Sequence, residues 1–324
     1  MKVLVTGASG MLGGAVASLL VQNGHTVRTL QRRSSGVLGA EDVTGQLTDR
    51  RTLETAVADM DAVVHLAAKV SFTGDPAEFH RVNVTGTADL LRAARTAGIG
   101  RFVHVSSPSV AHIGKPLVGA AAGPADPRQA RGSYARTKAE SEILALGAND
   151  DRMSVTAIRP HIVWGPGDTQ LVERVLNRAR AGRLPLLAGG TALVDTTYVD
   201  NAASAIAAAL HRIDHVRGLA LVVTNGEPRP IGELLARMCA AGGVPGPRMS
   251  VPSWVGRLAG SAVETFWRGS NADGEPPMTR FLAEQLSTAH WFDQRQTRKL
   301  LDWTPEVSLD EGFARLADHY GVAI

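Results

Sequence analysis

The first thirteen residues constrain the fold more than any other stretch of this chain. Lys2–Thr6 predicts a short buried strand, and Gly7, Gly10 and Gly13 follow it. Met11–Val21, which includes Gly13, continues as an Ala- and Leu-rich helix. Glycines at this spacing allow a tight turn, a close approach of the backbone to a pyrophosphate, and close packing of the helix on the strand. Because the N-terminus of such a helix attracts phosphate, the stretch predicts a dinucleotide-binding site.

The following residues alternate strands with helices, which predicts an α/β fold with a doubly wound parallel sheet of the Rossmann type. The further strands expected are Thr26–Leu30, Val43–Leu47, Ala62–Leu66, Phe102–Val105 and Val155–Ile158. The helices expected between them are one capped by Thr48-Asp49 and running through Ala58, then Phe79–Ala97 and Tyr134–Leu146. Residues 1–167 are therefore predicted to form an NADP-binding domain.

The pattern changes after about Asp168, and residues 168–324 predict mainly a substrate-binding lobe, with about 194–224 returning to the large sheet. The elements expected there are Leu171–Ala181, Asp200–Leu210, Leu219–Thr224, Ile231–Ala241, Gln294–Leu301 and Leu309–Tyr320. The apolar stretch Val251–Trp267 is interpreted as a core or lid helix, with contact to a membrane surface as the minor alternative. Gly114–Gly132 is rich in Ala, Gly and Pro and is expected to be a mobile flap.

Composition excludes several classes of function. The 34 Lys and Arg nearly balance 31 Asp and Glu, the basic residues are scattered, and only 5% of residues are aromatic, so no nucleic-acid partner is expected. No run of about 18 apolar residues predicts a membrane span. The single cysteine, Cys239, is expected in the core, and the start of the chain lacks a signal-peptide pattern. We therefore expect a cytoplasmic protein.

The second predicted strand ends in Gln31-Arg32-Arg33. A site for NAD usually has Asp or Glu here to accept a hydrogen bond from the ribose 2′-hydroxyl, whereas an arginine accommodates the 2′-phosphate of NADP. The absence of an acid predicts NADP(H). The alternative is that both arginines are merely solvated.

Tyr134 and Lys138 lie four residues apart on a predicted helix and so share one face, one turn from each other. A neighbouring ammonium favours the phenolate and is expected to lower the pKa of the tyrosine, which suits it to proton transfer at a substrate oxygen. A surface Tyr–Lys pair would look the same in isolation. The preceding cofactor motif and a nearby serine favour the catalytic interpretation.

That serine follows the fifth strand, in Ser106-Ser107-Pro108-Ser109. Parallel sheets bind ligands at the carboxyl ends of their strands, so Ser107 is the expected oxygen-binding residue, with Ser109 as the reserve candidate. A turn or helix cap is the alternative. Ala67 and Ala68, at the end of the fourth strand, leave room for a flat ring beside the sheet.

Other polar residues are expected to be structural. His65, His161 and His290 show no metal-ligand spacing, so packed or hydrogen-bonded imidazoles are expected and no metal site is predicted. Asp195 and Asp200 are expected to be caps or structural acceptors.

Taken together, these motifs resemble the extended short-chain dehydrogenase/reductase family over nearly the whole chain. The resemblance rests on the glycine turn, Asn83 in Asn-Val-Thr-Gly-Thr, Ser106-Ser107, the Tyr134/Lys138 pair, and Arg159-Pro160 with Gly165-Pro166-Gly167-Asp168. It implies a catalytic set of Ser107, Tyr134, Lys138 and Asn83, with Lys138 bonding the nicotinamide ribose and Asn83 supporting a proton-relay water. It also implies a homodimer through Phe79–Ala97 and Tyr134–Leu146.

The cofactor-binding residues expected on this basis are Gly7, Ser9, Gly10, Met11, Leu12, Gly13, Gln31, Arg32, Arg33, Gln46, Leu47, Leu66, Ala67, Ala68, Asn83, Tyr134, Lys138, Pro160, Ile162 and Val163. One departure concerns the adenine. The family usually has Gly-Asp-Leu after the third strand, whereas this chain has Gly45-Gln46-Leu47, whose glutamine carbonyl can still accept a hydrogen bond.

Within the family, the chain is similar to the branch containing 3β-hydroxysteroid dehydrogenases and sterol-4α-carboxylate 3-dehydrogenases. The signs are the Arg159–Asp168 run, Leu193–Asn201 and Thr224–Pro228. Ser107–Val110 and residues 274–292 resemble the bacterial 2-alkyl-3-oxoalkanoate reductases of long-chain olefin biosynthesis. This implies NADPH-dependent reduction of a long-chain 2-alkyl-3-oxoalkanoate, a large apolar substrate, with other enzymes of the same pathway as possible partners.

Two alternatives stay open. One is a 3β-hydroxysteroid or sterol dehydrogenase using NAD(P), and the other is a non-catalytic NADP-binding regulator, although regulators commonly lose the tyrosine or lysine that this chain keeps. Residues shaping the substrate pocket are expected within Gly114–Gly132, Pro185–Leu193 and Val251–Trp291.

Overall fold

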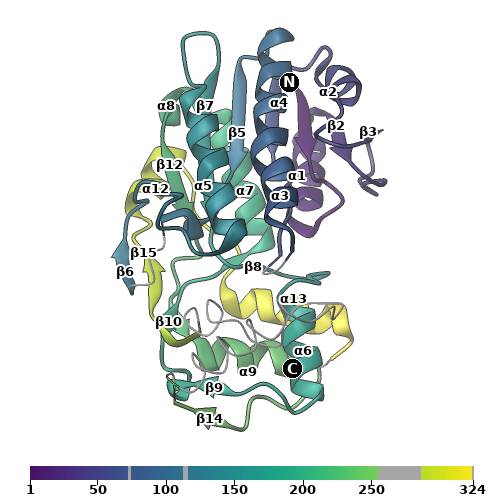
Figure 1. Cartoon of the computed structure of the whole chain (residues 1–324). Coiled ribbons are helices and arrows are strands. Elements are labelled where there is room, and N and C mark those ends of the chain that lie inside the picture. Colours follow the sequence, from purple (N-terminus) through teal and green to yellow (C-terminus); the bar gives the residue numbers. More distant parts are fainter. Residues whose placement is uncertain (72–73, 112–115, 253, 255–285, 323–324) are drawn as a thin grey trace.

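A seven-stranded parallel sheet forms the larger part of the molecule in the computed structural model (Figure 1). The structure describes residues 1–71, 74–111, 116–252, 254 and 286–322. In spatial order the strands are β12 (Ala220–Val223), β7 (Ser154–Pro160), β5 (Arg101–Val105), β4 (Ala62–His65), β1 (Lys2–Thr6), β2 (Thr26–Gln31) and β3 (Ala40–Thr44). Every pairing within it is parallel, which confirms the predicted Rossmann-type fold.

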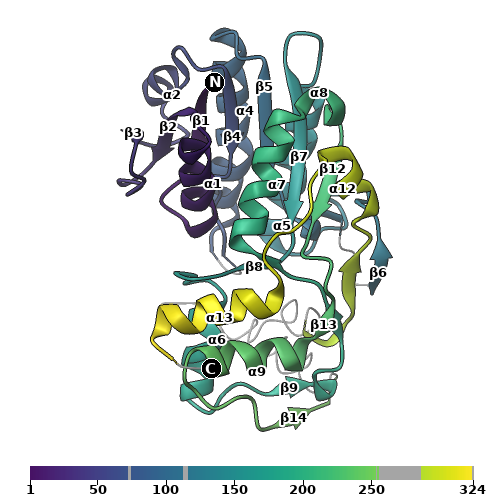
Figure 2. The same ribbon diagram turned by 180° about the vertical axis from the view of Figure 1, so that it is seen from behind.

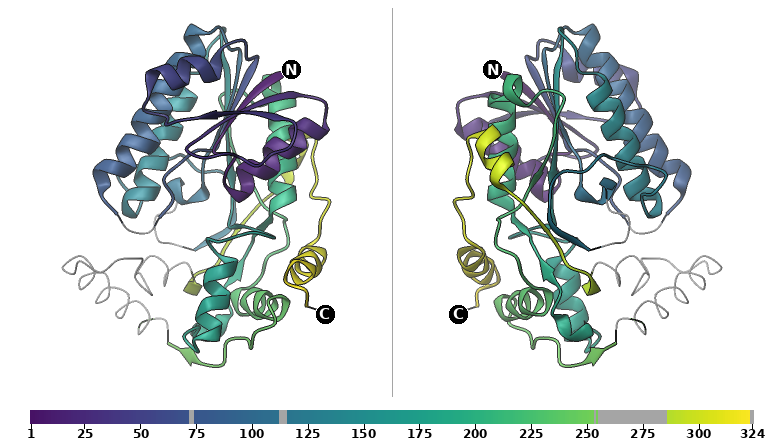
Figure 3. Two further views of the ribbon diagram at one scale, coloured as in Figure 1. Left: turned by 90° about the vertical axis from the view of Figure 1, so that its right-hand side faces the viewer. Right: turned by 90° about the vertical axis from the view of Figure 1, so that its left-hand side faces the viewer.

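Helices cover both faces of this sheet. Figure 2 shows α1 (Met11–Gln22), α7 (Val199–His211) and α8 (Ile213–Val216) on one face, and Figure 1 shows α4 (Gly86–Thr96) and α5 (Gly132–Gly147) on the other. The side views of Figure 3 show the resulting three layers. Helix α2 (Arg50–Val57) lies with α4, and Asp49 caps it by accepting from the Arg51 amide. Since both faces are covered, the central strands are largely apolar, with β4 buried at all its residues, whereas the edge strand β3 is largely exposed.

Two expected elements differ from the structure. The third strand is Ala40–Thr44 rather than Val43–Leu47, because Ala40 pairs with Val27 and the chain turns away at Gly45, whose amide donates to the Gln31 carbonyl. The flap expected from Gly114 to Gly132 contains strand β6 (Leu117–Ala120). That strand pairs with β15 (His290–Phe292), a partner that local composition could not reveal.

The long helix expected over Phe79–Ala97 is also interrupted. It consists of α3 (Pro76–Phe79), a π-helical turn (His80–Thr85) and α4. Such turns are rare and often occur at functional sites. Asn83 lies inside this one.

A smaller lobe lies beyond the carboxyl ends of the large sheet (Figures 1 and 2). It holds a four-stranded sheet in the order β13 (Arg229–Pro230), β10 (Leu193–Val194), β15 and β6. Two two-stranded sheets pair β11 (Thr197–Tyr198) with β8 (Val163–Trp164) and β14 (Ser250–Val251) with β9 (Leu186–Leu187). Among the described residues, its helices are α6 (Val172–Arg180), α9 (Ile231–Ala241) and α13 (Leu309–Tyr320).

The core of this lobe is aromatic and aliphatic. Trp164 stacks on Phe313 with ring centroids 4.5 Å apart, and Cys239 is buried among the same residues, as expected. Most of Val251–Trp267, the segment interpreted as a core or lid helix, lies outside the described residues, as does most of 274–292. Among the described helices, none is long and apolar enough to cross a membrane.

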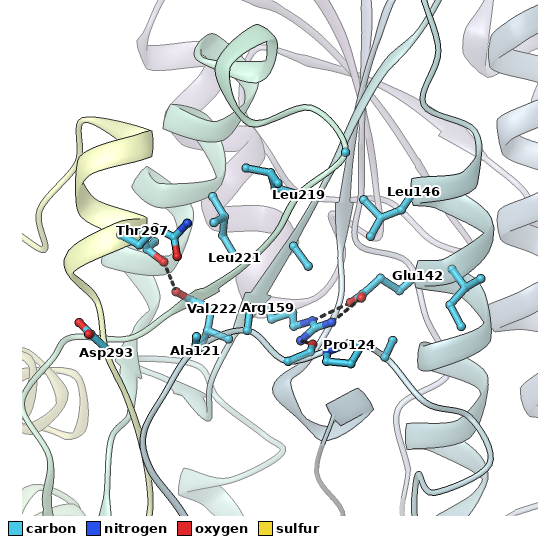
Figure 4. Close-up of a pocket in the computed structure, with 17 residues that line it drawn as sticks. Ala121, Pro124, Glu142, Leu146, Arg159, Leu219, Leu221, Val222, Asp293 and Thr297 are labelled. Atoms are coloured by element: carbon cyan, nitrogen blue, oxygen red, sulfur yellow. Dashed lines mark hydrogen bonds and ion pairs between the residues drawn. The ribbon is translucent and has the colours of Figure 1, made fainter.

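One edge of the large sheet is β12, which helix α12 (Arg295–Leu301) partly protects: Thr297 donates to the Val222 carbonyl at 2.9 Å. Figure 4 shows a cavity of about 440 Å³ beside this edge, with the Arg159–Glu142 ion pair at one wall. Neither Ser107 nor Tyr134 lines it.

Candidate active site

The glycine turn has the shape of a dinucleotide cradle. Gly7 has φ +80°, and a Cβ there would lie 2.8 Å from the Ala67 amide nitrogen. A Cβ on Gly13 would lie 2.2 Å from the Gly7 carbonyl oxygen. These two glycines are therefore required by backbone packing, and Gly13 is itself buried.

The other turn residues remain accessible. Ser9, Met11 and Leu12 are half-buried and Gly10 is exposed. No side chain caps α1 at Gly10, and its first turn carries no acid. The amide groups and the positive end of the helix dipole are thus left for an anion, which fits the pyrophosphate of a dinucleotide cofactor.

The wall beside this turn is the end of β4. The Thr6 hydroxyl accepts hydrogen bonds from the amides of Leu66 and Ala67 at 3.2 and 3.1 Å. Leu66, Ala67 and Ala68 are half-buried, so they offer a small-residue surface of the kind that a flat ring needs.

At the end of β2 the structure adds an acid that the local sequence did not reveal. Asp42 of β3 lies opposite Thr29 and accepts from its hydroxyl at 2.5 Å. It also accepts from the hydroxyls of Ser34 and Ser35 at 2.7 and 2.6 Å, from the Ser35 amide and from the Gln31 amide group. These hydroxyl bonds hold the pKa of Asp42 well below its ordinary value, although partial burial acts to raise it.

The donors to this carboxylate therefore come from β2 and from the loop between β2 and β3. Gln31, predicted to touch the cofactor, is instead buried and bonded to Thr29 and Asp42. Arg32 and Arg33, which follow it, are exposed. Arg32 and Arg33 thus place two exposed positive charges at this end of β2, beside the hydrogen-bonded Asp42 carboxylate.

The adenine side is defined by Gly45–Leu47. Gln46 is exposed, whereas Leu47 is buried against α2 and α4. A Cβ on Gly45 would lie 2.5 Å from the Thr52 side chain, so a larger residue there would displace α2. Of this group, Gln46 has the accessible side chain.

Ser107 and Tyr134 meet at the carboxyl end of β5. Their side chains are hydrogen-bonded to each other, and Ser109 donates to the Ser107 oxygen at 2.9 Å. Since Ser107 accepts from Ser109, its own proton is available to the phenol oxygen or to a substrate oxygen. Ser109, the reserve candidate, therefore orients Ser107 instead of replacing it.

The electrostatics of Tyr134 differ from the expectation. Burial raises the pKa of Tyr134 above its ordinary value, and the Ser107 hydrogen bond only partly offsets this. The expected lowering by Lys138 is wrong for this structure, because the Lys138 ammonium donates to the Val105 carbonyl at 2.7 Å. The phenol is therefore fully protonated at neutral pH, the state required of a proton donor.

Lys138 is almost completely buried on α5. Burial lowers the pKa of Lys138 to about 8, against an opposing effect of Glu142 one turn further on. Glu142 itself makes a two-bond ion pair with Arg159, at 2.8 and 2.5 Å, and Arg159 also donates to the Gly123 carbonyl at 2.7 Å.

Asn83 connects the π-helical turn to the tyrosine helix. Its side-chain oxygen accepts from the Lys69 amide at 2.7 Å, and its nitrogen donates to the Thr137 hydroxyl at 3.0 Å. Thr137 lies between Tyr134 and Lys138 on α5. The visible role of the Asn83 side chain is thus to fix the catalytic helix against the loop after β4.

The predicted residues Pro160, Ile162 and Val163 lie where β7 leaves the large sheet for the smaller lobe. Pro160 is buried, and Ile162 and Val163 are half-buried. Ile162 has φ +45°, a conformation that β-branched residues rarely adopt and that often marks functional sites. His161, expected to be structural, is buried and bonds the Asp195 carbonyl.

The fold and this arrangement define an NAD(P)-dependent oxidoreductase site: a phosphate cradle, an oxygen-binding serine, a protonated tyrosine and a buried lysine. Comparison with known proteins supports the same class of enzyme. Residues 3–223 match the model of the NAD dependent epimerase/dehydratase family, and the chain belongs to that family.

Two named relatives are similar to this chain over nearly its whole length. A 2-alkyl-3-oxoalkanoate reductase of Stenotrophomonas maltophilia (strain K279a) is 40% identical over 98% of both chains. A 3-beta-hydroxysteroid dehydrogenase of Mycolicibacterium neoaurum is 30% identical over 98% of this chain and 91% of its own length.

Among solved structures, that of gox2253 is 26% identical with a TM-score of 0.77, covering 99% of both chains. MoeE5 in complex with UDP-glucose and NAD is 23% identical with a TM-score of 0.74, covering 98% of both chains, and shows a shared fold.

Proposed function

We propose that this enzyme reduces the ketone of a long-chain 2-alkyl-3-oxoalkanoate to the 2-alkyl-3-hydroxyalkanoate with NADPH, in the biosynthesis of long-chain olefins. The observation that carries the reaction type is the Ser107–Tyr134 hydrogen bond beside the buried Lys138. The substrate class is supported by the reductase of Stenotrophomonas maltophilia and by a second of the same name, from Shewanella oneidensis, 34% identical over 96% of this chain and 84% of its own.

When bound, the reduced nicotinamide supplies the hydride that the ketone carbon accepts. As that carbon becomes tetrahedral, its oxygen takes up negative charge. Ser107 donates a hydrogen bond to this oxygen, which stabilises the transition state more than the ground state. Tyr134 transfers its phenol proton to the same oxygen, and the product is the secondary alcohol.

Lys138 supports the step by position. Its ammonium lies on α5 one turn from Tyr134 and is held in place by the Val105 carbonyl. Its remaining N–H donors would bond the nicotinamide ribose. Asn83, through the loop after β4, would support a water that returns the proton from bulk solvent.

The preference for NADPH is supported by Arg32 and Arg33. Both are exposed after the end of β2, and the nearby Asp42 already accepts five hydrogen bonds, two from β2 and three from the loop after it. A free carboxylate for a ribose 2′-hydroxyl is thus absent from the described part of this loop, whereas two cations are available for a 2′-phosphate.

The test follows NADPH absorbance while the purified enzyme receives a long-chain 2-alkyl-3-oxo acid. Tyr134→Phe should abolish turnover and leave NADPH binding, measured by fluorescence titration, largely intact. Turnover retained in that variant would refute the catalytic assignment.

A second candidate is favoured by the 3-beta-hydroxysteroid dehydrogenase relative: oxidation of a 3β-alcohol of a steroid or sterol. The same four residues would serve, because oxidation is the reverse of the reaction above. A steroid ketone with NADPH, and a 3β-alcohol with NAD, are the parallel substrates. Turnover of the steroid alone would replace the oxo-acid assignment but leave the site standing.

A further inference from the structure

A line of buried hydrogen bonds runs behind the site, from the glycine turn to the tyrosine helix. It starts at Thr6, the last residue of β1, and passes through His65, the last residue of β4. The Thr6 hydroxyl lies 2.7 Å from Nδ1 of His65, and Nε2 of the same ring lies 2.9 Å from the Thr87 hydroxyl. Thr87 donates to the Asn83 carbonyl at 2.6 Å.

The direction of every bond in this line is fixed. A carbonyl cannot donate, so the Thr87 proton points to Asn83, and Thr87 must accept from His65. His65 therefore carries its proton on Nε2. Nδ1 is then an acceptor and receives the Thr6 proton, which agrees with Thr6 already accepting from the amides of Leu66 and Ala67.

Only a neutral imidazole can make this connection, since a charged ring would have two donors and no acceptor. His65 is 1% exposed. Burial, followed by the charge of Lys138, lowers the pKa of His65 to about 3, so the ring stays neutral throughout the working range of an enzyme.

The far end of the line reaches the catalytic helix. Asn83 donates through its side chain to Thr137, and Thr137 donates in turn to the Ser133 carbonyl at 2.8 Å. The hydroxyls of Thr6, Thr87 and Thr137 all belong to residues with 4% exposure or less. Solvent therefore does not replace any of these bonds when one is removed.

We propose that His65 is a positioning residue: through Thr87 it holds the Asn83 backbone in the π-helical turn and thereby sets the Tyr134 helix against the cofactor cradle. The inference rests on the proposed function, because Asn83 and Tyr134 take their roles there. The ring thus adds a link between the β1–β4 wall and α5, beside the one that the Asn83 side chain makes to the Lys69 backbone.

The test compares Thr87→Val with Thr156→Val. Both threonines are buried, and each donates one hydroxyl hydrogen bond to a backbone carbonyl, that of Thr156 to Leu219 at 3.0 Å. We expect Thr87→Val to lower kcat about tenfold with the Kd of NADPH within about twofold of wild type. Thr156→Val, which lies outside the line, should keep its kcat within about twofold while losing similar thermal stability.

The role of the His65 ring is tested by comparing a conservative replacement with an apolar one. His65→Gln retains one acceptor and one donor, and should stay within about threefold of the wild-type kcat, whereas His65→Leu should lose about tenfold. In the double variant His65→Leu/Thr87→Val, kcat should fall no further than in His65→Leu, since both changes break one line.

Equal kcat values for Thr87→Val and Thr156→Val would overturn the proposal, as would additive losses in the double variant. If Thr87→Val does not fold, the Gln and Leu variants of His65 decide, and equal kcat values there overturn it. Tyr134→Phe is measured alongside, so that failure of the proposed function can be told from failure of the positioning role. Turnover retained in Tyr134→Phe would refute the proposed function. An inactive Tyr134→Phe together with wild-type kcat in the His65 and Thr87 variants would refute only the positioning role.

Discussion

The Glu142–Arg159 ion pair gives the sharpest prediction of stability. The two side chains are 2% and 1% exposed, and two hydrogen bonds join them (Figure 4). Glu142→Gln removes the negative charge and one of the two acceptor oxygens, so the buried Arg159 guanidinium is left with neutral acceptors only, the remaining amide oxygen and the Gly123 carbonyl. Breaking one partner of such a pair costs about 3–5 kcal/mol, because an uncompensated charge remains in a poorly solvating interior.

That cost can be converted to a melting temperature. Unfolding entropy near the midpoint is roughly 2.1 cal/mol/K per residue, so a chain of 324 residues gives about 0.7 kcal/mol/K. A loss of about 4 kcal/mol then lowers Tm by about 6 °C, measurable by circular dichroism or scanning calorimetry. The free energy itself comes from urea unfolding at constant pH.

The matched control is Glu54→Gln. Glu54 pairs with Arg50 at 2.7 Å, but the two side chains are 56% and 92% exposed. Water and salt screen such a pair, so Glu54→Gln is expected to leave Tm nearly unchanged. A further variant, Glu142→Leu/Arg159→Met, removes both charges and should recover most of the loss. Equal destabilisation by Glu142→Gln and Glu54→Gln would refute the argument that burial makes this pair decisive.

Three further predictions concern the cofactor site. Arg32→Ala/Arg33→Ala should raise the KM for NADPH about tenfold and leave that for NADH nearly unchanged, as initial rates will show; equal effects on both cofactors would exclude a 2′-phosphate contact. Asp42→Asn should loosen the loop that its carboxylate orders and raise the KM for NADPH about threefold at constant kcat, and an altered kcat would contradict this. Because burial lowers the pKa of Lys138 to about 8, kcat/KM for NADPH should fall as the pH rises through that value; a flat profile to pH 10 would show that the ammonium charge is not needed.

The sequence alone determined the features that depend on short spacing. The turn at Gly7, Gly10 and Gly13 follows a strand and opens a helix, so three glycines within one turn identify the cradle without knowledge of the rest of the fold. Tyr134 and Lys138 share a helix face because the helical period places residues four apart together. The parallel sheet likewise follows from strands that alternate with helices.

Only the tertiary structure decided which distant residues meet. The Ser107–Tyr134 hydrogen bond, the Asp42 carboxylate opposite Thr29, and the pairing of β6 with β15 all join segments that no local pattern connects. The burial of particular side chains could not be predicted from the local sequence either. It raises the pKa of Tyr134 where a simple pair with Lys138 predicted a decrease, because desolvation of a phenolate outweighs the bonds that the site provides.

For His65, too, the sequence predicted the general state of the side chain, and only the tertiary structure showed its partners. Its sequence context gave only a histidine after a strand, for which a packed or hydrogen-bonded ring was the reasonable expectation, and the structure confirms that it is buried and bonded. What the ring connects depends on Thr6, Thr87 and Asn83 converging from strand β1, helix α4 and the π-helical turn. Residue types and periods are properties of the local chain, whereas hydrogen-bond partners and desolvation are properties of the packed interior.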